Sequence, residues 1–226
     1  MSGLALEVAV NRWIKPKFEA ETNLVLDFDW RPTAALMRDI ASGARADMII
    51  AISDSMDRLV ADGIVLADSR KRLADSVLGV GVKAGARRPD ISTVEAFKSA
   101  MRGARAVAYS QAGASGIYFA ALIERLGIAD EVNSRAVVIP MGFTAERVAN
   151  GEADLAIQQV SELMSVDGID VVGPFPPEIQ VSSTFEVAIF REATNTEGAR
   201  AFLDALTSGA SGEAYERGGL RSRLEA

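Results

Sequence analysis

Residues 109–126, YSQAGASGIYFAALIERL, contain the end of a strand, a small open loop and most of a helix. The apolar residues 106–109 are typical of a strand, and Gly113, Ala114 and Gly116 leave the loop free of bulk. Ser115 stands where a helix N-cap is expected, and apolar residues then recur at helical spacing until Gly127. The stretch therefore predicts an α/β protein. The loop itself has two interpretations, an anion site or a capped helix with nothing bound.

Cysteine and histidine are both absent from the 226 residues. The missing cysteines exclude disulfides, thiolate metal sites and cysteine nucleophiles. The missing histidines exclude Ser-His-Asp catalysis, the usual zinc ligands and the commonest general base near neutral pH. We therefore expect neither a metal nor a cofactor, and any catalysis has to use carboxylates, lysine, tyrosine or arginine.

Charge and hydropathy limit the partners of the chain. The net charge is −7 and the pI is about 4.8, with both signs mixed along the sequence. This balance disfavours a nucleic-acid partner, which needs a basic face. No apolar run approaches the ~20 residues that cross a bilayer, so we expect no membrane insertion. With 49% hydrophobic residues the chain can bury a large core, in one domain or in two. We expect the protein to be a monomer.

The first ten residues, MSGLALEVAV, lack a basic region followed by a long apolar stretch, so no secretory signal is visible. Two locations stay open. The protein is periplasmic if a signal has been removed, and cytoplasmic if this is the full native chain.

Strands and helices alternate through the first part of the sequence. We expect strands at 4–10, 24–28 and 47–52. A helix should follow each strand, the first ending near residue 22, the second running from a Thr33 cap to 43, and the third running from 53 or 54 to 63. Three such units predict a parallel sheet with helices packed on it.

The remaining chain continues this pattern after a link. Ser92 and Glu95 match a capping box, and the prolines of VVGPFPP (171–177) indicate a return link rather than regular structure. The expected strands are 77–82, 136–139, 154–157 and 184–190, the helices are 92–102, 144–150 and 196–206, and the tail 208–226 should be partly helical. We predict two lobes, residues 1–82 with 183–226 and residues 83–182, joined by two crossover links with a ligand cleft between them.

This order of motifs resembles the type II periplasmic substrate-binding proteins, and within them the branch similar to molybdate-binding proteins. The resemblance covers nearly the whole chain. It implies a two-lobed α/β fold in which each lobe is a mostly parallel sheet flanked by helices, and it fixes the fold more than the ligand. The segments that carry it are GARADMIIAIS (43–53), SVLGVGVKAGARRPDISTVEAFK (76–98), YSQAGASG (109–116), ERVANGEADLAIQQVSEL (146–163) and VVGPFPPEIQ (171–180).

The resemblance also implies which positions contact a ligand. Proteins similar to the molybdate receptors hold the oxyanion with hydroxyl residues after the first two strands and with loops of the second lobe. Thr33 and Ser115 match that pattern, whereas Asn11, Arg12 and Gln159 depart from it. The ligand-binding candidates are Asn11, Arg12, Trp13, Arg31, Thr33, Ser53, Ala114, Ser115, Gly116, Met141 and Gln159.

The departures favour an organic acid over molybdate or tungstate. A planar carboxylate matches the bidentate fork of arginine. Arg12 and Arg31, expected at adjacent strand ends, would present that fork, and Asn11 and Gln159 would bond the remaining oxygens. We therefore expect a di- or tricarboxylate, while a molybdate-like oxyanion stays open. The alternative for each arginine is a solvated surface position.

Binding without catalysis is the favoured function, in a solute-binding protein that closes on a small anion and serves an ABC-type permease. Enzyme activity stays open. The alternative is a carboxylic acid isomerase on the same scaffold, because the resembled family is thought to include aconitate isomerases. Such an enzyme moves a proton without a cofactor, and its base would be Tyr109, Tyr118, Glu186 or Asp54.

Three acidic residues have structural interpretations. Asp47 and Asp154 follow small-residue turns, so we interpret them as turn-stabilising carboxylates rather than metal ligands. Glu186 lies in the strand sequence Phe-Glu-Val-Ala, and alternation predicts that it faces solvent.

Overall fold

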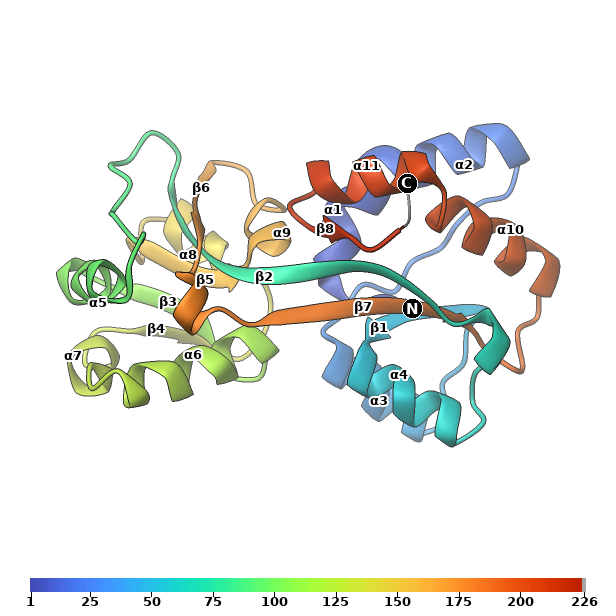
Figure 1. Cartoon of the computed structure of the whole chain (residues 1–226), viewed down its shortest axis with the longest axis horizontal. Coiled ribbons are helices and arrows are strands. Elements are labelled where there is room, and N and C mark those ends of the chain that lie inside the picture. Colours follow the sequence, from blue (N-terminus) through green and yellow to red (C-terminus); the bar gives the residue numbers. More distant parts are fainter. Residues whose placement is uncertain (225–226) are drawn as a thin grey trace. The chain divides into compact units, whose positions relative to one another are not determined.

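The computed structural model describes residues 1–224, which fall into two compact units (Figure 1). Unit 1 is Met1–Ser76 together with the chain from Ser183 onward, and unit 2 is Val77–Ser182. The chain passes between the units within β2 (Lys71–Lys83) and at the start of β7 (Ser182–Ile189). Residues 225 and 226 of the predicted tail lie outside the described residues.

The sheet of unit 1 contains β1 (Met48–Ile52), β7 and the first part of β2. β1 and β7 are antiparallel, with Ile50 opposite Val187. A short strand, β8 (Arg221–Ser222), pairs with β2 at Ala74 and Asp75. Ser2 forms parallel bridges to both Ile50 and Trp30, so the first residues of the chain also belong to this sheet.

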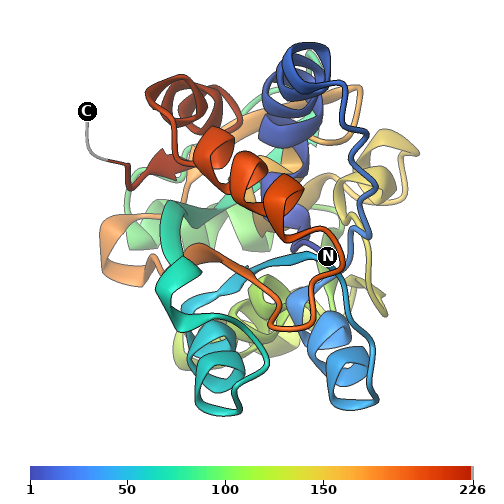
Figure 2. The ribbon, with the colours of Figure 1, turned by 90° about the vertical axis from the view of Figure 1, so that its right-hand side faces the viewer.

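Helices cover both faces of the unit 1 sheet (Figures 1 and 2). α3 (Thr33–Ala41) and α4 (Ser53–Ala61) lie on one face, and α10 (Thr196–Leu206) and α11 (Gly209–Arg217) lie on the other. Ile49 of β1 packs with Leu59 of α4, whereas the next residue, Ile50, packs with Phe202 of α10. Both faces of β1 are therefore buried, which explains its uninterrupted apolar sequence. η3 (Ala67–Ser69) leads into β2.

The sheet of unit 2 has β3 (Val107–Ser110) between two parallel neighbours, β4 (Val137–Ile139) and β5 (Leu155–Gln159). The second part of β2 is antiparallel to β5, with Val80 opposite Ile157. β6 (Ile169–Pro174) is also antiparallel to β2.

Residue size along β3 separates the two faces of the unit 2 sheet. Val107 and Tyr109 pack with Phe119, in a core shared with α5 (Val94–Gly103), α6 (Ala114–Arg125) and α7 (Ala129–Asn133). Ala108, on the alternate face, belongs to a core with α8 (Ala145–Ala149) and α9 (Val160–Leu163). The alternation of large residues with alanine therefore assigns each face of β3 to its own helices.

The α/β class with sheets between helices is confirmed, and several elements match the predicted ranges closely. The helix predicted at 196–206 is α10, and the helices predicted from residues 33 and 53 are α3 and α4. The predicted capping box is displaced by one residue, because the N-cap of α5 is Thr93, whose hydroxyl accepts from Ala96 N at 3.1 Å.

The strand predicted at 4–10 is wrong. Residues 4–22 form one helical stretch, made of η1 (Leu4–Leu6), α1 (Glu7–Ala9), η2 (Val10–Ile14) and α2 (Lys15–Thr22). Its core residues Leu6, Val10, Ile14 and Phe18 recur every four positions, which is helical spacing. The apolar residues between them obscured that period. Pro16 is accommodated in the first turn of α2, after the π-helical turn η2.

The segment predicted as a strand at 24–28 is extended, but the backbone of Leu26 is hydrogen-bonded to side chains of α2 instead of to a strand. Leu26 N donates to Glu19 Oε1 at 2.7 Å, and Lys15 Nζ donates to Leu26 O at 2.6 Å. The return link predicted at 171–177 is also wrong in its first half, since β6 runs to Pro174. Of the later prolines, Pro176 is the N-cap of η4 (Pro177–Ile179) and Pro177 is its first residue.

Candidate functional site

Three helical segments begin at one edge of unit 1, here called the unit 1 edge, which comprises residues 2–4, 30–33 and 52–54. Ser2 forms parallel β-bridges to both Trp30 and Ile50. The three extended segments therefore run in the same direction, and their carboxyl ends lie at one edge. Helical structure begins just beyond them, at Leu4, Thr33 and Ser53. First-turn N–H groups have no partner within their own helix, and the helix dipole favours negative charge there. The unit 1 edge therefore offers backbone donors to an anion.

Thr33 and Gly3 approach each other at this edge. The N-cap of α3 is Pro32, so the predicted capping role of Thr33 is wrong and Thr33 is instead the first helical residue. A Cβ placed on Gly3 would lie 3.3 Å from Thr33 Oγ1 and 2.9 Å from the Phe185 ring. Gly3 was missed by the sequence analysis. Its signal is a glycine directly before a buried helical run.

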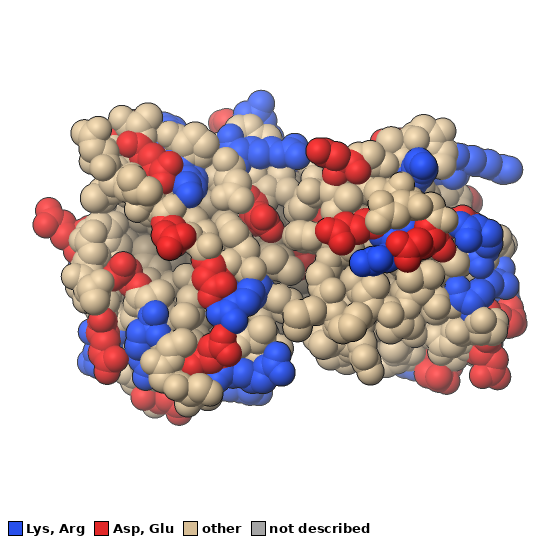
Figure 3. Space-filling model, turned by 180° about the vertical axis from the view of Figure 1, so that it is seen from behind, with Lys and Arg blue, Asp and Glu red and all other residues tan. Residues whose placement is uncertain are grey.

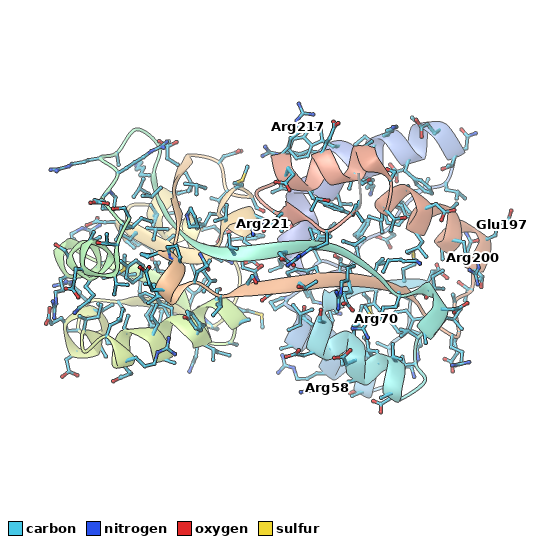
Figure 4. The ribbon with its side chains drawn as sticks, in the orientation of Figure 1. Arg58, Arg70, Glu197, Arg200, Arg217 and Arg221 are labelled. Atoms are coloured by element: carbon cyan, nitrogen blue, oxygen red, sulfur yellow. The ribbon has the colours of Figure 1, made fainter. Side chains whose placement is uncertain are left out.

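Ser53 belongs to a buried ionic network. Its hydroxyl donates to Glu186 Oε1 at 3.0 Å. Glu186 is 1% exposed, so the prediction that it faces solvent is wrong. Arg70 bonds Glu186 through Nε and contacts Asp57 through Nη1 at 2.7 Å. Figure 4 shows Arg70 on the α4 side of β7. The Ser53 hydroxyl therefore supports the start of α4, whose first-turn N–H groups face the edge.

The Arg31 guanidinium is bound by carboxylates of its own unit. Nε donates to Asp29 Oδ1 at 2.7 Å, and the two terminal nitrogens bond Asp29 and Asp39. These hydrogen bonds raise the pKa of Arg31. A ligand carboxylate that uses the Arg31 fork has to compete with Asp29.

Asn11, Arg12 and Trp13 lie on η2, about two helical turns after the helix start at Leu4. Asn11 and Arg12 are exposed. Trp13 is half-buried, and the Arg217 guanidinium carbon lies 5.5 Å from its ring centroid. The premise that Arg12 and Arg31 occupy adjacent strand ends is therefore wrong, because Arg12 follows no strand.

The loops after three parallel strands meet in unit 2, at what is here called the unit 2 edge, comprising residues 110–115, 140–144 and 158–160. β4 and β5 flank β3 in parallel, so their carboxyl ends coincide. Gln111 N donates to Ile139 O at 2.8 Å, and Ala112 N donates to Pro140 O at 3.2 Å. These bonds join the loop before α6 to the loop after β4.

The start of α6 packs closely on the end of β3. The N-cap is Gly113, so the prediction that Ser115 caps this helix is wrong. Ala114 is the first helical residue, and Ser115 is 5% exposed. A Cβ on Gly116 would lie 1.7 Å from Ser110 O, and one on Gly113 would lie 2.4 Å from Ser110 Oγ. The glycines of this loop therefore serve close packing, which holds the first-turn N–H groups of the twelve-residue α6 at the unit 2 edge.

Two glutamines end β5, and their environments differ. Gln158 orders the loop after β4, since Thr144 N donates to Gln158 Oε1 at 2.8 Å and Gln158 Nε2 donates to Gly142 O at 3.1 Å. Met141, in the same loop, is 50% exposed. Gln159 is 8% exposed, and its buried Oε1 has no hydrogen-bond partner among residues 1–224. A buried unpaired acceptor is costly, so Oε1 suits a ligand that brings a donor.

The candidate bases differ in availability. Tyr109 OH donates to Asn133 Oδ1 at 2.8 Å, and burial raises the pKa of its phenol, so it keeps its proton. Tyr118 OH donates to Ile179 O at 2.8 Å. Glu186 is bound by Arg70, whereas Asp54 is exposed at the start of α4. Asp54 is therefore the candidate base with the freest access.

Asp47 and Asp154 are confirmed as turn-stabilising carboxylates. Asp47 Oδ1 accepts from the backbone N–H groups of Thr194 and Asn195, at 2.8 and 2.9 Å. Asp154 Oδ2 accepts from Arg105 N at 2.7 Å. Within residues 1–224, no cluster of three or more acidic side chains is arranged to hold a metal ion.

The surface in Figure 3 carries acidic and basic side chains interspersed on each unit. No helix in the described part of the chain has the length and apolar character needed to cross a membrane.

Comparisons with known proteins agree with this architecture. Residues 2–221 match the family model of the bacterial extracellular solute-binding proteins. The chain is 35% identical over 216 residues to an aconitate isomerase from Pseudomonas sp., covering 93% of this chain and 82% of that protein. It is 26% identical over 212 residues to the molybdate-binding protein ModA of Escherichia coli K12, covering 92% and 82%. The periplasmic molybdate-binding protein of Azotobacter vinelandii superimposes with a TM-score of 0.79 at 18% identity, covering 97% of this chain and 96% of that one. The chain belongs to the bacterial extracellular solute-binding protein family.

Proposed function

We propose that this chain is a solute-binding protein for a small organic di- or tricarboxylate, which it delivers to an ABC-type permease. Each unit offers first-turn N–H groups that bind a carboxylate, those of α6 at the unit 2 edge and those of α3 and α4 at the unit 1 edge. Thr33 and Ser115 lie at these helix starts and supply hydroxyls. The chain performs no bond cleavage in this function.

The unpaired Oε1 of Gln159 is the observation that carries the choice of ligand. Fully deprotonated oxyanions such as molybdate and sulfate offer only acceptor oxygens, so they leave this buried acceptor unpaired. An organic acid with a hydroxyl or a protonated carboxyl group supplies the missing donor. The choice is also supported by the higher identity to the aconitate isomerase, 35% against 26% for the molybdate-binding protein.

The role of the arginines is reduced in this proposal. The guanidinium of Arg31 is shared with Asp29 and Asp39, and Arg12 lies two turns into a helix. Arg31 contributes positive charge near Thr33, while backbone donors and Gln159 provide the directional contacts.

A thermal-shift screen tests the function. A ligand that binds the folded protein raises its melting temperature. The rise grows with the logarithm of the ratio of the ligand concentration to Kd. Citrate and malate, which carry a hydroxyl group, should raise it, and molybdate, tungstate, sulfate and phosphate at equal concentration should raise it less. A shift with molybdate or tungstate alone would assign the protein to the metal-oxyanion receptors.

An isomerase of a carboxylic acid is the second candidate, favoured by the 35% identity to an aconitate isomerase over 93% of this chain. In that function Asp54 is the base, since it is exposed at the start of α4, while the hydroxyl groups of Tyr109 and Tyr118 donate hydrogen bonds to Asn133 and Ile179. NMR of cis-aconitate incubated with the protein distinguishes the two functions. Conversion that is lost in Asp54→Asn identifies the enzyme, whereas binding without conversion identifies the receptor.

A further inference from the structure

A cavity of about 860 Å³ lies within unit 2, at the end of the sheet opposite the unit 2 edge. Arg105 and Asp154, which line it, come just before β3 and β5, and Lys83 is the last residue of the antiparallel β2. β3 and β5 are parallel, with Val107 opposite Leu155, so their amino ends lie together. The cavity is therefore separate from the helix starts at the unit 2 edge, and its volume falls within the ~300–1,000 Å³ of small-molecule sites.

The loop between β2 and α5, residues 84–90, forms one wall of the cavity. Figure 1 shows this loop projecting from unit 2. Near its start, Gly85 N donates to Asp170 Oδ2 at 3.2 Å, and at its end Asp90 Oδ1 accepts from Ser92 N at 2.9 Å. Both ends of the loop are thus fixed by hydrogen bonds, so this wall is in place before a ligand binds.

The facing wall is a row of small residues on α5. Ala96, Ala100 and Gly103 recur at helical spacing and line the cavity, whereas Phe97 and Met101 are fully buried in the core of unit 2. Ala96 and Ala100 are partly exposed, and a Cβ on Gly103 would meet no described residue within 4 Å. A flat apolar group can therefore lie close along this side of α5.

The lining carries four basic and two acidic side chains, although the whole chain has a net charge of −7. Arg105 Nη2 donates to Asp154 Oδ1 at 3.1 Å, and Arg88 Nη2 lies 3.3 Å from a carboxylate oxygen of β6. Lys83 and Arg87 are exposed, and neither is paired with a carboxylate among residues 1–224. Two cations of the lining are therefore available to a ligand.

We propose that this cavity is a second ligand site, which binds an aromatic phosphomonoester. The phosphate group is bound by Lys83 and Arg87, because its oxygens accept from an ammonium and a guanidinium group at once. Its charge of about −2 at pH 7 balances both cations. The aromatic ring lies against Ala96 and Ala100 of α5. An inorganic anion has no part that fills this apolar side of the cavity, so it binds more weakly.

Calorimetric titration of phenyl phosphate and AMP tests the charged half of the site. The double variant Lys83→Gln/Arg87→Gln should lower the affinity for both esters by about tenfold or more. Lys71→Gln/Arg58→Gln is the matched control, since it removes the same two charges from exposed positions of unit 1, and it should change the affinity by less than about twofold. Equal affinities in the two double variants, or no binding of either ester to the wild type at millimolar concentration, would overturn the proposal.

A change of shape without a change of charge tests the apolar half. Ala100→Phe fills the space beside α5, so it should lower the affinity for phenyl phosphate and leave that for inorganic phosphate unchanged. Ser99→Phe, also on the lining and exposed, replaces it if circular dichroism shows that the first variant is unfolded. An unchanged affinity for phenyl phosphate in a folded variant would contradict the site. Citrate affinity should stay the same in all these variants, which separates this proposal from the proposed function.

Discussion

The Ser53 hydroxyl donates to Glu186 Oε1 at 3.0 Å, which joins the first residue of α4 to the buried centre of β7. Glu186 is 1% exposed and is bound on its other oxygen by Arg70. A buried carboxylate needs such hydrogen-bond donors. When the carboxylate is removed, each donor that remains is left without its acceptor.

We predict that Glu186→Leu destabilises unit 1, because it leaves the Arg70 guanidinium and the Ser53 hydroxyl without their acceptor. The Arg70 side chain is 27% exposed, so water offsets part of the loss and we expect about 2 kcal/mol in urea unfolding. Arg72→Ala is the control. Its side chain is 74% exposed and contacts Glu186 at 3.4 Å, so its effect should stay below about 0.5 kcal/mol. Similar losses in the two variants would contradict the network.

Gly116→Ala should destabilise unit 2 by about 3 kcal/mol, because its Cβ would lie 1.7 Å from Ser110 O and α6 would have to shift. Gly103→Ala, at the end of α5, is the matched substitution. Its Cβ meets no described residue within 4 Å, so it should be neutral or stabilising by up to about 0.5 kcal/mol. Both tryptophans, Trp13 and Trp30, lie in unit 1. Far-UV circular dichroism, rather than tryptophan fluorescence, is therefore the probe for unit 2.

Asp47 makes the stability of unit 1 depend on acid pH. The backbone N–H of Asn195 is the main cause that lowers the pKa of Asp47, with further hydrogen bonds from Thr194, against partial burial. A carboxylate with a lowered folded pKa contributes its full stabilisation above its unfolded value of about 3.9, and this contribution is lost as the pH falls through the folded value. We predict that Asp47→Asn lowers stability at pH 7 and flattens the decline below about pH 4. An unchanged slope in guanidinium unfolding between pH 5 and pH 2.5 would contradict this.

The pairing of Arg31 with Asp29 predicts a gain of ligand affinity. Asp29→Asn weakens the hold on Nε and Nη2 and removes a negative charge close to the unit 1 edge, so citrate affinity should rise several-fold. Arg31→Ala should lower it. Asp68→Asn, in η3, makes the same charge change elsewhere in the unit and is the control for net charge. Calorimetric titration measures all three variants. Equal affinity in Asp29→Asn and Asp68→Asn would exclude a local effect of Arg31.

The sequence predicted the fold well where one rule applied at a time. β1 is buried on both faces and reads as an apolar run, and α10 has a clear helical period with Asn195 as its cap. It failed at residues 4–10, where the helical period of Leu6, Val10 and Ile14 is hidden by further apolar residues. It failed at Glu186 because alternation assumes one solvent face, whereas both faces of β7 are covered.

The candidate site was predicted less well, since its residues depend on contacts that spacing does not contain. Gly113 and Gly116 were expected to leave room for an outside group, but Ser110 fills the space beside them. Arg31 was expected to face a ligand, but Asp29 and Asp39 lie two residues before it and eight residues after it and bind it first. Gln159 Oε1 has no hydrogen-bond partner among the described residues. This depends on the tertiary structure around it, so no local sequence pattern predicts it.

Titration of citrate and tricarballylate into the wild type and Gln159→Leu tests the central claim most directly. Tricarballylate is citrate without its hydroxyl group. If that hydroxyl donates to Gln159 Oε1, the wild type should prefer citrate by about tenfold, and the preference should disappear in Gln159→Leu. An equal preference in both proteins, or binding of molybdate in place of either acid, would contradict the account.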